Sequence, residues 1–442
     1  MPSARQSPEC RYWHAHAQGR DLRAMNRPTP RRHAPRALAA AAVALTTVVL
    51  ASGPPATARP AAPPGAAEPG RTSVVTWAAS ADRLSTAGAA PERTYRLVVR
   101  TSAGGDGLRI RLSNAFGTRP VTFGRAHAGL RATGAALVPG TNRPLSFAGS
   151  PSVTVPPGGS VSSDPLPGTV RPRSDLAVSL YVRDAGGAAT GHRMALQTSY
   201  VAPSGDHASD DTATAYTQPV TSWFYLDAVT VNARRGTSAV AALGDSITDG
   251  ALSTRDTNRR WPDFLARRLD ADAGTRVKGV ANEGISGNKV LKDGSGESAL
   301  KRLDRDVLTQ AGVRTVVLLE GVNDIKSVPA PTAAELIAGY RQIVDRSHAA
   351  GVCVVGATVM PYEGWREWTP AGEAVRQEVN AFVRESGAFD AVVDFDRAVM
   401  DPAAPSRILP AYNSGDHLHP NDLGMRRMAD IVDLKSLRCH RR

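Results

Sequence analysis

The chain has 442 residues, of which 42% are hydrophobic and 21% are charged, and its formal net charge is +12. This length predicts two or three domains, and the hydrophobic content excludes a chain that is disordered throughout. Residues 1–58 hold eight arginines and two acids, a net charge of +6, so half of the excess lies in this stretch. The remaining residues contain no Lys and Arg cluster interleaved with aromatic residues, which argues against a nucleic-acid partner.

The N-terminal residues 1–58 are predicted to be a leader with a secretory signal peptide. Four arginines between residues 27 and 36 precede the apolar run 37–51, and Ala56-Thr57-Ala58 offers a cleavage site of small residues. The apolar run is shorter than the about 20 residues that a membrane span needs, so we expect no stable membrane anchor after cleavage. We expect a secreted mature protein whose translation starts at Met25, just ahead of the basic region.

Residues 59–71 are rich in Pro and Ala and are predicted to be a linker. From 72 to 235 the apolar residues recur with a period of two, as where Leu108, Ile110 and Leu112 alternate with polar residues. This alternation is typical of half-buried strands, and clusters of turn residues separate the apolar segments. The stretch therefore predicts an all-β sandwich or jelly-roll-like domain.

Residues 236–442 show a different pattern, in which apolar runs alternate with helical patterns. This alternation predicts βαβ units and a parallel sheet covered on both faces, with ligands bound beyond the carboxyl ends of the strands. We interpret these residues as a separate α/β domain. The apolar runs are 239–243, 276–281, 315–319, 352–360 and 391–395, and the helical patterns are 260–270, 297–310, 333–349 and 371–386.

Two cysteines, Cys353 and Cys439, remain after the leader, which holds Cys10. A disulfide between them is one interpretation, suited to an oxidising compartment, and the other is that Cys353, within an apolar run, is a small core residue. Two isolated thiols do not make a ligand set, so no metal site is expected from them.

Ser246 is the candidate nucleophile. It lies in Gly244-Asp245-Ser246, directly after the first apolar run of the α/β part and ahead of helix-compatible sequence. A turn of this kind presents a serine at the carboxyl end of a strand, although a serine in such a turn also serves as a helix cap.

A serine hydroxyl needs a base, and the base needs a partner that fixes its tautomer. Asp416 precedes His419 by three residues on a turn that enters the helical stretch 421–432. This spacing lets the carboxylate reach one ring nitrogen while the other faces the nucleophile. We interpret His417 as a bystander, and Ser204-Gly205-Asp206-His207, which lacks the second histidine, as a turn of the β domain.

Donors for a developing oxyanion are predicted at the ends of the next two strands. The loop 282–288 after the second apolar run contains Gly284 and Gly287, and a glycine amide there can approach a substrate closely; Asn323 follows the third run. The nearby acids Asp245, Asp249 and Asp324 are expected to form local structural hydrogen bonds.

Together these blocks resemble the SGNH hydrolase superfamily, also called the GDSL esterases and lipases, over roughly 237–435. The resemblance implies a three-layer α/β/α flavodoxin-like fold, a serine acylhydrolase activity and no metal or organic cofactor. It also implies oxyanion donors from the backbone of Ser246 and Gly287 and from the Asn323 side chain. The β domain resembles those that precede the hydrolase domain in some secreted bacterial members. The residues that match the superfamily name are Ser246, Gly287, Asn323 and His419, and Asp416 matches its triad acid.

Three aromatic residues, Tyr362, Trp365 and Trp368, lie in the loop after the fourth apolar run and could stack on a sugar or contact an acyl chain; packing under the loop is the alternative. The expected function is hydrolysis of carboxylic esters through an acyl-enzyme, with short acyl or acetyl esters as substrates and a polysaccharide as one candidate carrier of the acyl group. A lipase or phospholipase is the alternative enzyme, although the sequence shows no continuous apolar lid. A surface- or glycan-binding protein with a vestigial hydrolase domain is the alternative of another class.

Overall fold

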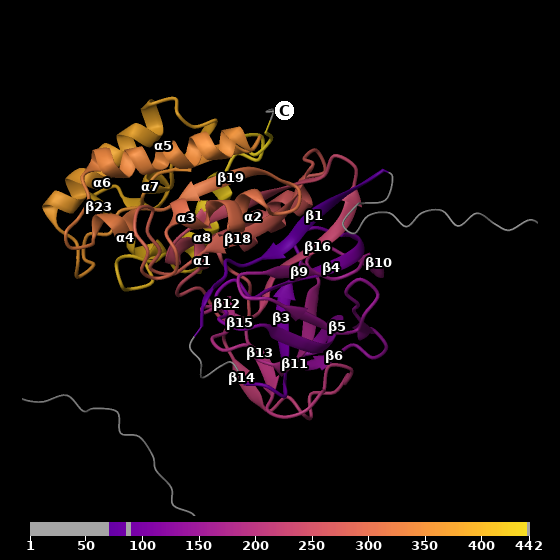
Figure 1. Cartoon of the computed structure of the whole chain (residues 1–442). Helices are drawn as coiled ribbons and strands as arrows, with labels where there is room; N and C mark the ends of the chain where they lie inside the picture. Colours follow the sequence, from indigo (N-terminus) through magenta and orange to yellow (C-terminus); the bar gives the residue numbers. More distant parts are fainter. Residues whose placement is uncertain (1–69, 85–89, 440–442) are drawn as a thin grey trace, which may run out of the picture. The chain divides into compact units, whose positions relative to one another are not determined.

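A computed structural model describes residues 70–84 and 90–439 (Figure 1). The predicted leader 1–58 with its start at Met25, and all but the last two residues of the predicted linker 59–71, lie outside the described residues.

Antiparallel strands make up the chain from Arg71 to Arg234. One sheet has the order β1 (Arg71–Ala78), β16 (Leu226–Arg234), β4 (Gly105–Ser113) and β10 (Leu166–Val170), with β9 (Ser160–Ser162) paired to β4. A second sheet has the order β14 (Gln218–Val220), β13 (Ser199–Ala202), β3 (Arg93–Arg100), β11 (Asp175–Asp184), β5 (Val121–Thr133) and β6 (Ala136–Leu137), with β7 (Arg143–Pro144) and β8 (Val153–Val155) paired to β5. A small third sheet contains β15 (Trp223–Phe224), β12 (Thr190–His192) and β2 (Asp82–Arg83).

The period-two alternation accounts for how these sheets pack. Leu108 and Ile110 of β4 and Leu97 and Val178 of the second sheet are buried in one hydrophobic core. Because every second side chain of a strand points to the same face, two amphipathic sheets bury their apolar faces against each other. The strand-rich fold predicted for this region is confirmed.

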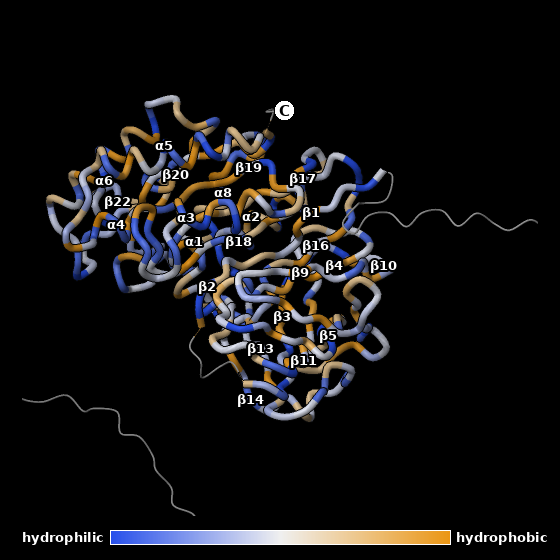
Figure 2. Tube along the Cα trace, viewed as in Figure 1, coloured by the Kyte–Doolittle hydropathy of each residue, from blue (hydrophilic) through white to orange (hydrophobic). Residues whose placement is uncertain are grey.

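A parallel sheet follows, in the order β18 (Val277–Gly284), β17 (Ser238–Gly244), β19 (Val313–Leu319), β20 (Cys353–Ala357) and β21 (Ala391–Val393). All four pairings are parallel. The strands are almost fully buried, as expected for a sheet covered on both faces, and Figure 2 shows their hydrophobic residues. From β17 the chain first adds β18 on one side and then crosses to add β19, β20 and β21 on the other side. This change of side makes a topological switch point at the carboxyl ends of β17 and β19.

The helices match most of the predicted patterns and complete the three layers. In the structure α2 contacts α8 and β18, whereas α5 contacts α6 and β20, and right-handed crossovers place α2 and the α5–α6 pair on opposite faces (Figure 1). None of the helices in the described part of the chain is long and apolar enough to cross a membrane. The helices are α1 (Ser246–Asp249), α2 (Trp261–Ala271), α3 (Ala299–Leu303), α4 (Val322–Ile325), α5 (Ala333–Ala349), α6 (Pro370–Glu385), α7 (Phe395–Val399) and α8 (Asp422–Ile431), and the remaining elements are η2 (Asp304–Leu308), η3 (Pro410–Tyr412) and the hairpin β22 (Met400–Asp401) and β23 (Ala404–Ile408).

One helix differs from its prediction. The pattern over 297–310 predicts a single helix, but the structure has α3 followed by the wider π-helical turn η2. This turn buries the carboxylate of Asp306 at 3.3 Å from the guanidinium of Arg302, which is itself fully buried. The π-helical turn thus coincides with a buried charge pair, which the helical pattern of the sequence does not predict.

The β region and the α/β region share a hydrophobic core. Val74 and Val75 of β1 are fully buried among the side chains of the parallel-sheet region. The Val75 amide also donates a hydrogen bond to the carbonyl of Ala311 (2.8 Å). The predicted boundary at 235/236 falls between β16 and β17. Because Val74 and Val75 precede this boundary and the parallel sheet follows it, side chains from both sides of the boundary stabilise the same core.

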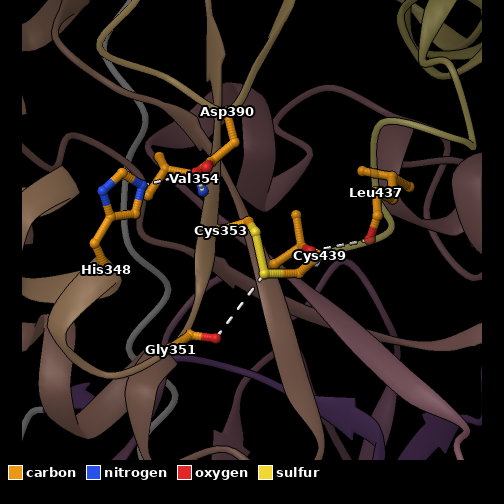
Figure 3. The surroundings of a disulfide bond; sticks show 8 residues. His348, Gly351, Cys353, Val354, Asp390, Leu437 and Cys439 are labelled. Atoms are coloured by element: carbon orange, nitrogen blue, oxygen red, sulfur yellow. Dashed lines mark hydrogen bonds and ion pairs between the residues drawn. A yellow bond between two sulfur atoms is a disulfide. The ribbon is translucent and has the colours of Figure 1, made fainter. Parts of the chain in front are cut away.

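A disulfide joins Cys353, the first residue of β20, to Cys439, which follows α8 in the chain (Figure 3). The two Cα atoms are 5.4 Å apart. Nearby, the hydroxyl of Thr315 donates a hydrogen bond to the carbonyl of Leu437 (2.9 Å). Of the two interpretations that the sequence left open, the structure has the disulfide, and it ties the C-terminal segment to the sheet.

Candidate active site

The turn after β17 presents Ser246. Asp245 caps α1, because its side chain accepts a hydrogen bond from the Ile247 amide (2.9 Å). Burial raises the pKa of this Asp245 carboxyl to about 7. A Cβ on Gly244 would lie 2.5 Å from the carbonyl oxygen of Leu319, so the strand end has room only for glycine. The turn therefore fixes Ser246 as the first helical residue at the carboxyl edge of the sheet.

Ser246, His419 and Asp416 form a continuous hydrogen-bonded chain. Ser246 Oγ lies 2.8 Å from His419 Nε2, and His419 Nδ1 lies 2.6 Å from Asp416 Oδ2. Since a carboxylate only accepts, Nδ1 carries the proton and Nε2 is left to accept the serine proton. The three residues predicted as nucleophile, base and acid are thus brought together from positions up to 173 residues apart.

Asp416 is held as a carboxylate. Partial burial opposes its ionisation, but hydrogen bonds from the His419 ring and from the amides of His419 and Leu418 outweigh this effect and lower the pKa of Asp416 below its usual value. Because the carboxylate keeps its charge, it can stabilise an imidazolium at His419.

His417 and His207, the histidines of the two Ser-Gly-Asp-His sequences, have partners outside the hydrogen-bonded chain. His417 is exposed, and its ring nitrogen lies 3.1 Å from the side-chain nitrogen of Asn413. His207 pairs with Asp210 in the β region (2.8 Å).

Gly287 occupies a position that only glycine fits. Its φ is +81°, and a Cβ there would lie 2.6 Å from the hydroxyl of Ser295. The left-handed conformation and the close contact both disfavour any side chain. The loop can therefore present the Gly287 amide without a side chain in front of it.

Asn323 lies on α4, at the end of β19, and is 5% exposed. One hydrogen of its amide donates to the backbone carbonyl of Asn288 (2.9 Å), which leaves the second hydrogen for another acceptor. Its neighbour Asp324 accepts hydrogen bonds from the amides of Val290 (2.8 Å) and Leu291 (3.1 Å). These bonds tie the loop after β18 to α4, so the predicted oxyanion residues belong to connected loops.

The three aromatic residues of the predicted substrate loop lie in different surroundings. Tyr362 is fully buried in the core, and Trp368 is partly buried and packs against it. Trp365 stands edge-on to the ring of His419, with the ring centroids 6.1 Å apart, and the ammonium of Lys326 lies 4.8 Å from the Trp365 centroid. Trp365 alone of the three contacts the triad, and Tyr362 is not placed to touch a ligand.

Sequence reasoning missed His192 beside the site, and it expected only local hydrogen bonds for Asp249. His192 of β12 lies 2.9 Å from Asp249 of α1, and Asp249 accepts hydrogen bonds from both the amide and the hydroxyl of Ser286. His192 and Asp249 are 57 residues apart and belong to different fold regions, so no local pattern joins them.

As for metals, the described residues include no group of three or more His, Cys, Asp or Glu side chains placed to hold an ion.

Comparison with known protein families identifies the α/β region. Residues 242–427 match the family described as GDSL-like Lipase/Acylhydrolase family, and the match includes every residue of the hydrogen-bonded chain. This segment is a GDSL-like lipase/acylhydrolase domain. The protein therefore carries a carboxylic ester hydrolase domain, and the predicted resemblance is confirmed. No curated protein matches the chain.

The acylhydrolase domain is also similar to solved structures. An aryl esterase from M. smegmatis aligns at 17% identity over 44% of this chain and 95% of the other, with a TM-score of 0.36. A carbohydrate acetylesterase, Est24, from Sinorhizobium meliloti aligns at 16% identity over 44% and 95%, with a TM-score of 0.35. An acetylxylan esterase from Geobacillus stearothermophilus, solved as a catalytic mutant, aligns at 21% identity over 45% and 94%, with a TM-score of 0.35.

Proposed function

We propose that this protein hydrolyses short-chain carboxylic esters through an acyl-enzyme on Ser246, with His419 as the base and Asp416 as its orienting acid. The observation that carries the proposal is the hydrogen-bonded chain from Ser246 Oγ through the His419 ring to the Asp416 carboxylate. An unassisted serine is a weak nucleophile, and this arrangement supplies both the base and the fixed tautomer that it needs.

In the first half of the reaction, Ser246 Oγ attacks the carbonyl carbon and its proton passes to His419 Nε2. The bond to the alcohol oxygen then breaks, and His419 returns the proton to the departing alcohol. In the second half, His419 takes a proton from water, whose oxygen attacks the acyl-enzyme, and the acid leaves as Ser246 regains its proton. Asp416 stabilises the imidazolium in both halves.

The oxyanion that forms in each half needs donors fixed in advance. We assign this role to the amides of Ser246 and Gly287 and to the side chain of Asn323. The glycine-only position of Gly287 and the remaining N–H of Asn323 support the assignment. Loss of one such donor typically costs about 100- to 1000-fold in turnover.

For the substrate, we propose short acyl groups, such as acetyl, carried on a polysaccharide. Trp365 stands beside the base, where its ring can stack on a sugar. Residues 254–259, which follow the nucleophile helix, are all polar and mostly exposed, and Thr254 is anchored by hydrogen bonds to Asp422. An exposed polar segment next to the nucleophile helix suits a hydrated glycan better than a lipid surface, for which an apolar lid is expected.

We also propose that the protein is exported. The basic and apolar leader with its small-residue site supports this proposal, and so does the disulfide, since structural disulfides persist in oxidising compartments. Recovery of the mature chain from the culture medium, cleaved after Ala58, is the expected result. A protein that stays in the cytoplasm with its leader attached would contradict export.

The test of the substrate is a panel of p-nitrophenyl esters from acetate to palmitate, run beside acetylated xylan and a phospholipid. Ser246→Ala serves as the control for each substrate. We expect Ser246-dependent hydrolysis that favours acetate and releases acetate from xylan. A preference for palmitate or phospholipid would indicate a lipase instead, and binding to xylan without any Ser246-dependent hydrolysis would indicate a glycan-binding protein.

A further inference from the structure

His192 reaches the acylhydrolase domain from the β region. It ends β12, the middle strand of the small sheet, and is 4% exposed. Its Nδ1 lies 3.0 Å from the carbonyl oxygen of Ser80, and its Nε2 lies 2.9 Å from Oδ1 of Asp249. Asp249 is the last residue of α1, the helix that Ser246 begins, so the β region touches the nucleophile helix directly.

These contacts require a proton between His192 and Asp249. A carbonyl oxygen only accepts, so Nδ1 must donate to Ser80, and the neutral ring would then present a bare Nε2. A bare nitrogen and a carboxylate oxygen are both acceptors and cannot bond to each other. The 2.9 Å contact is therefore satisfied by an imidazolium against a carboxylate, or by one shared proton.

The second oxygen of Asp249 holds the oxyanion loop. Asp249 Oδ2 accepts hydrogen bonds from the amide (3.0 Å) and the hydroxyl (2.6 Å) of Ser286, the residue before Gly287. On the other side of Gly287, Asn288 accepts a hydrogen bond from Arg302 (2.9 Å). The Gly287 peptide is thus bracketed by two anchored neighbours, and one of the anchors depends on Asp249.

The surroundings of His192 favour its charged form. Burial opposes the charge, but Asp249 and the carbonyl of Ser80 outweigh this effect and raise the pKa of His192. Trp223 packs against the ring at a centroid distance of 5.5 Å. Of the other charged groups, Arg260 lies over the Trp223 ring and opposes the protonated state, and Arg193 faces outward and pairs with Asp82.

We propose that His192 is a positioning residue for ester hydrolysis, which through Asp249 and Ser286 holds the Gly287 amide in the oxyanion site. The β region is then part of the catalytic unit rather than a separate module joined to it. This inference rests on the proposed acyl-enzyme function of Ser246. Holding the Gly287 amide in place speeds the reaction, because a donor fixed in advance does not reorganise when the negative charge develops on the substrate oxygen.

The test compares His192→Ala and His192→Gln with the unmodified protein on p-nitrophenyl acetate. His192→Ala is expected to lower kcat by about 10- to 100-fold with KM within about twofold, since a misplaced donor weakens the transition state more than substrate binding. Glutamine can donate to Asp249 without a ring, so His192→Gln should recover part of the loss. The matched control is His207→Ala, which removes a histidine paired with Asp210 in the same β region and should leave kcat unchanged.

A double-mutant comparison shows whether His192 acts through Asp249. In an Asp249→Asn background, His192→Ala should cause little further loss of kcat. An equal loss in both backgrounds, or unchanged kcat in a folded His192→Ala protein, would overturn the inference. If His192→Ala does not fold, His192→Gln and Ser286→Ala replace it, and the loss of kcat that each causes is again compared between the unmodified and the Asp249→Asn background. Absence of Ser246-dependent hydrolysis in the unmodified protein would instead contradict the proposed function.

Discussion

In the proposed mechanism, the spacing of three residues between Asp416 and His419 sets the orientation of the base. Asp416 uses one oxygen for the His419 ring and the other for the amides of Leu418 and His419, so the carboxylate and the ring are fixed by the same turn. The backbone bonds remain when the side chain at 416 becomes neutral. The base therefore keeps part of its orientation without the charge.

This arrangement predicts a ranking of two substitutions. His419→Ala removes the base and should lower kcat by about 10⁴-fold or more, whereas Asp416→Asn should cost less because the ring is still held by its turn. Steady-state kinetics on p-nitrophenyl acetate measure both losses. A larger loss for Asp416→Asn than for His419→Ala would mean that His419 is not the base.

Among elements, the loop after β18 carries the clearest prediction. Gly287→Ala places a Cβ 2.6 Å from Ser295 Oγ at φ +81°, so the loop must shift and kcat should fall by about 10-fold or more. Gly294 lies in the same loop with no atom within 4 Å of an added Cβ, and Gly294→Ala is the matched control. Equal kinetics for the two variants would remove Gly287 from the oxyanion site.

The elements of the acylhydrolase domain could be predicted because each carries its own pattern. The apolar run 239–243 became β17, and the helical pattern 333–349 became α5 with the same bounds, which a capping box of Thr332 and Glu335 begins. The candidate catalytic residues were predictable from local signals as well, since Ser246 follows a strand and Asp416 and His419 lie on the turn ahead of α8. For Tyr362 the sequence left two interpretations open, contact with a ligand and packing under the loop, and only the structure shows that its ring is buried in the core.

In the whole molecule, the contact between the two fold regions could not be predicted. It is built from polar residues far apart in the chain, such as Ser80, which donates a hydrogen bond to Glu283 (2.7 Å) and accepts one from Arg302 (2.8 Å). In the sequence these residues look like ordinary surface positions. Only the folded chain shows that they are buried, and that a buried polar group needs such partners.

The His192–Asp249 contact also predicts how stability depends on pH. The pKa of His192 is raised in the folded state, so its contribution is fully present below the ordinary value of about 6.5 and is lost as pH rises through the raised value. Melting temperatures of the unmodified protein and of His192→Gln, measured from pH 5 to 9, should converge as pH rises. A constant difference between the two proteins would show that His192 carries no proton-linked stability.

The disulfide predicts a second effect on the whole chain. It closes a loop over a sequence separation of 86 residues, and loss of such a cross-link lowers the free energy of unfolding by about 2–5 kcal/mol. Denaturant unfolding of the Cys353→Ser/Cys439→Ser protein measures this change. An unchanged midpoint and slope would indicate that the bridge does not form in solution.

The proposed reaction requires Ser246 to form a covalent acyl-enzyme, so its hydroxyl must react with a fluorophosphonate, which the mass of the protein and peptide mapping will detect. We expect one adduct, on the peptide that contains Ser246, with simultaneous loss of esterase activity, and no adduct on Ser246→Ala. An adduct on another residue, or ester hydrolysis that persists in Ser246→Ala, would contradict the proposed reaction.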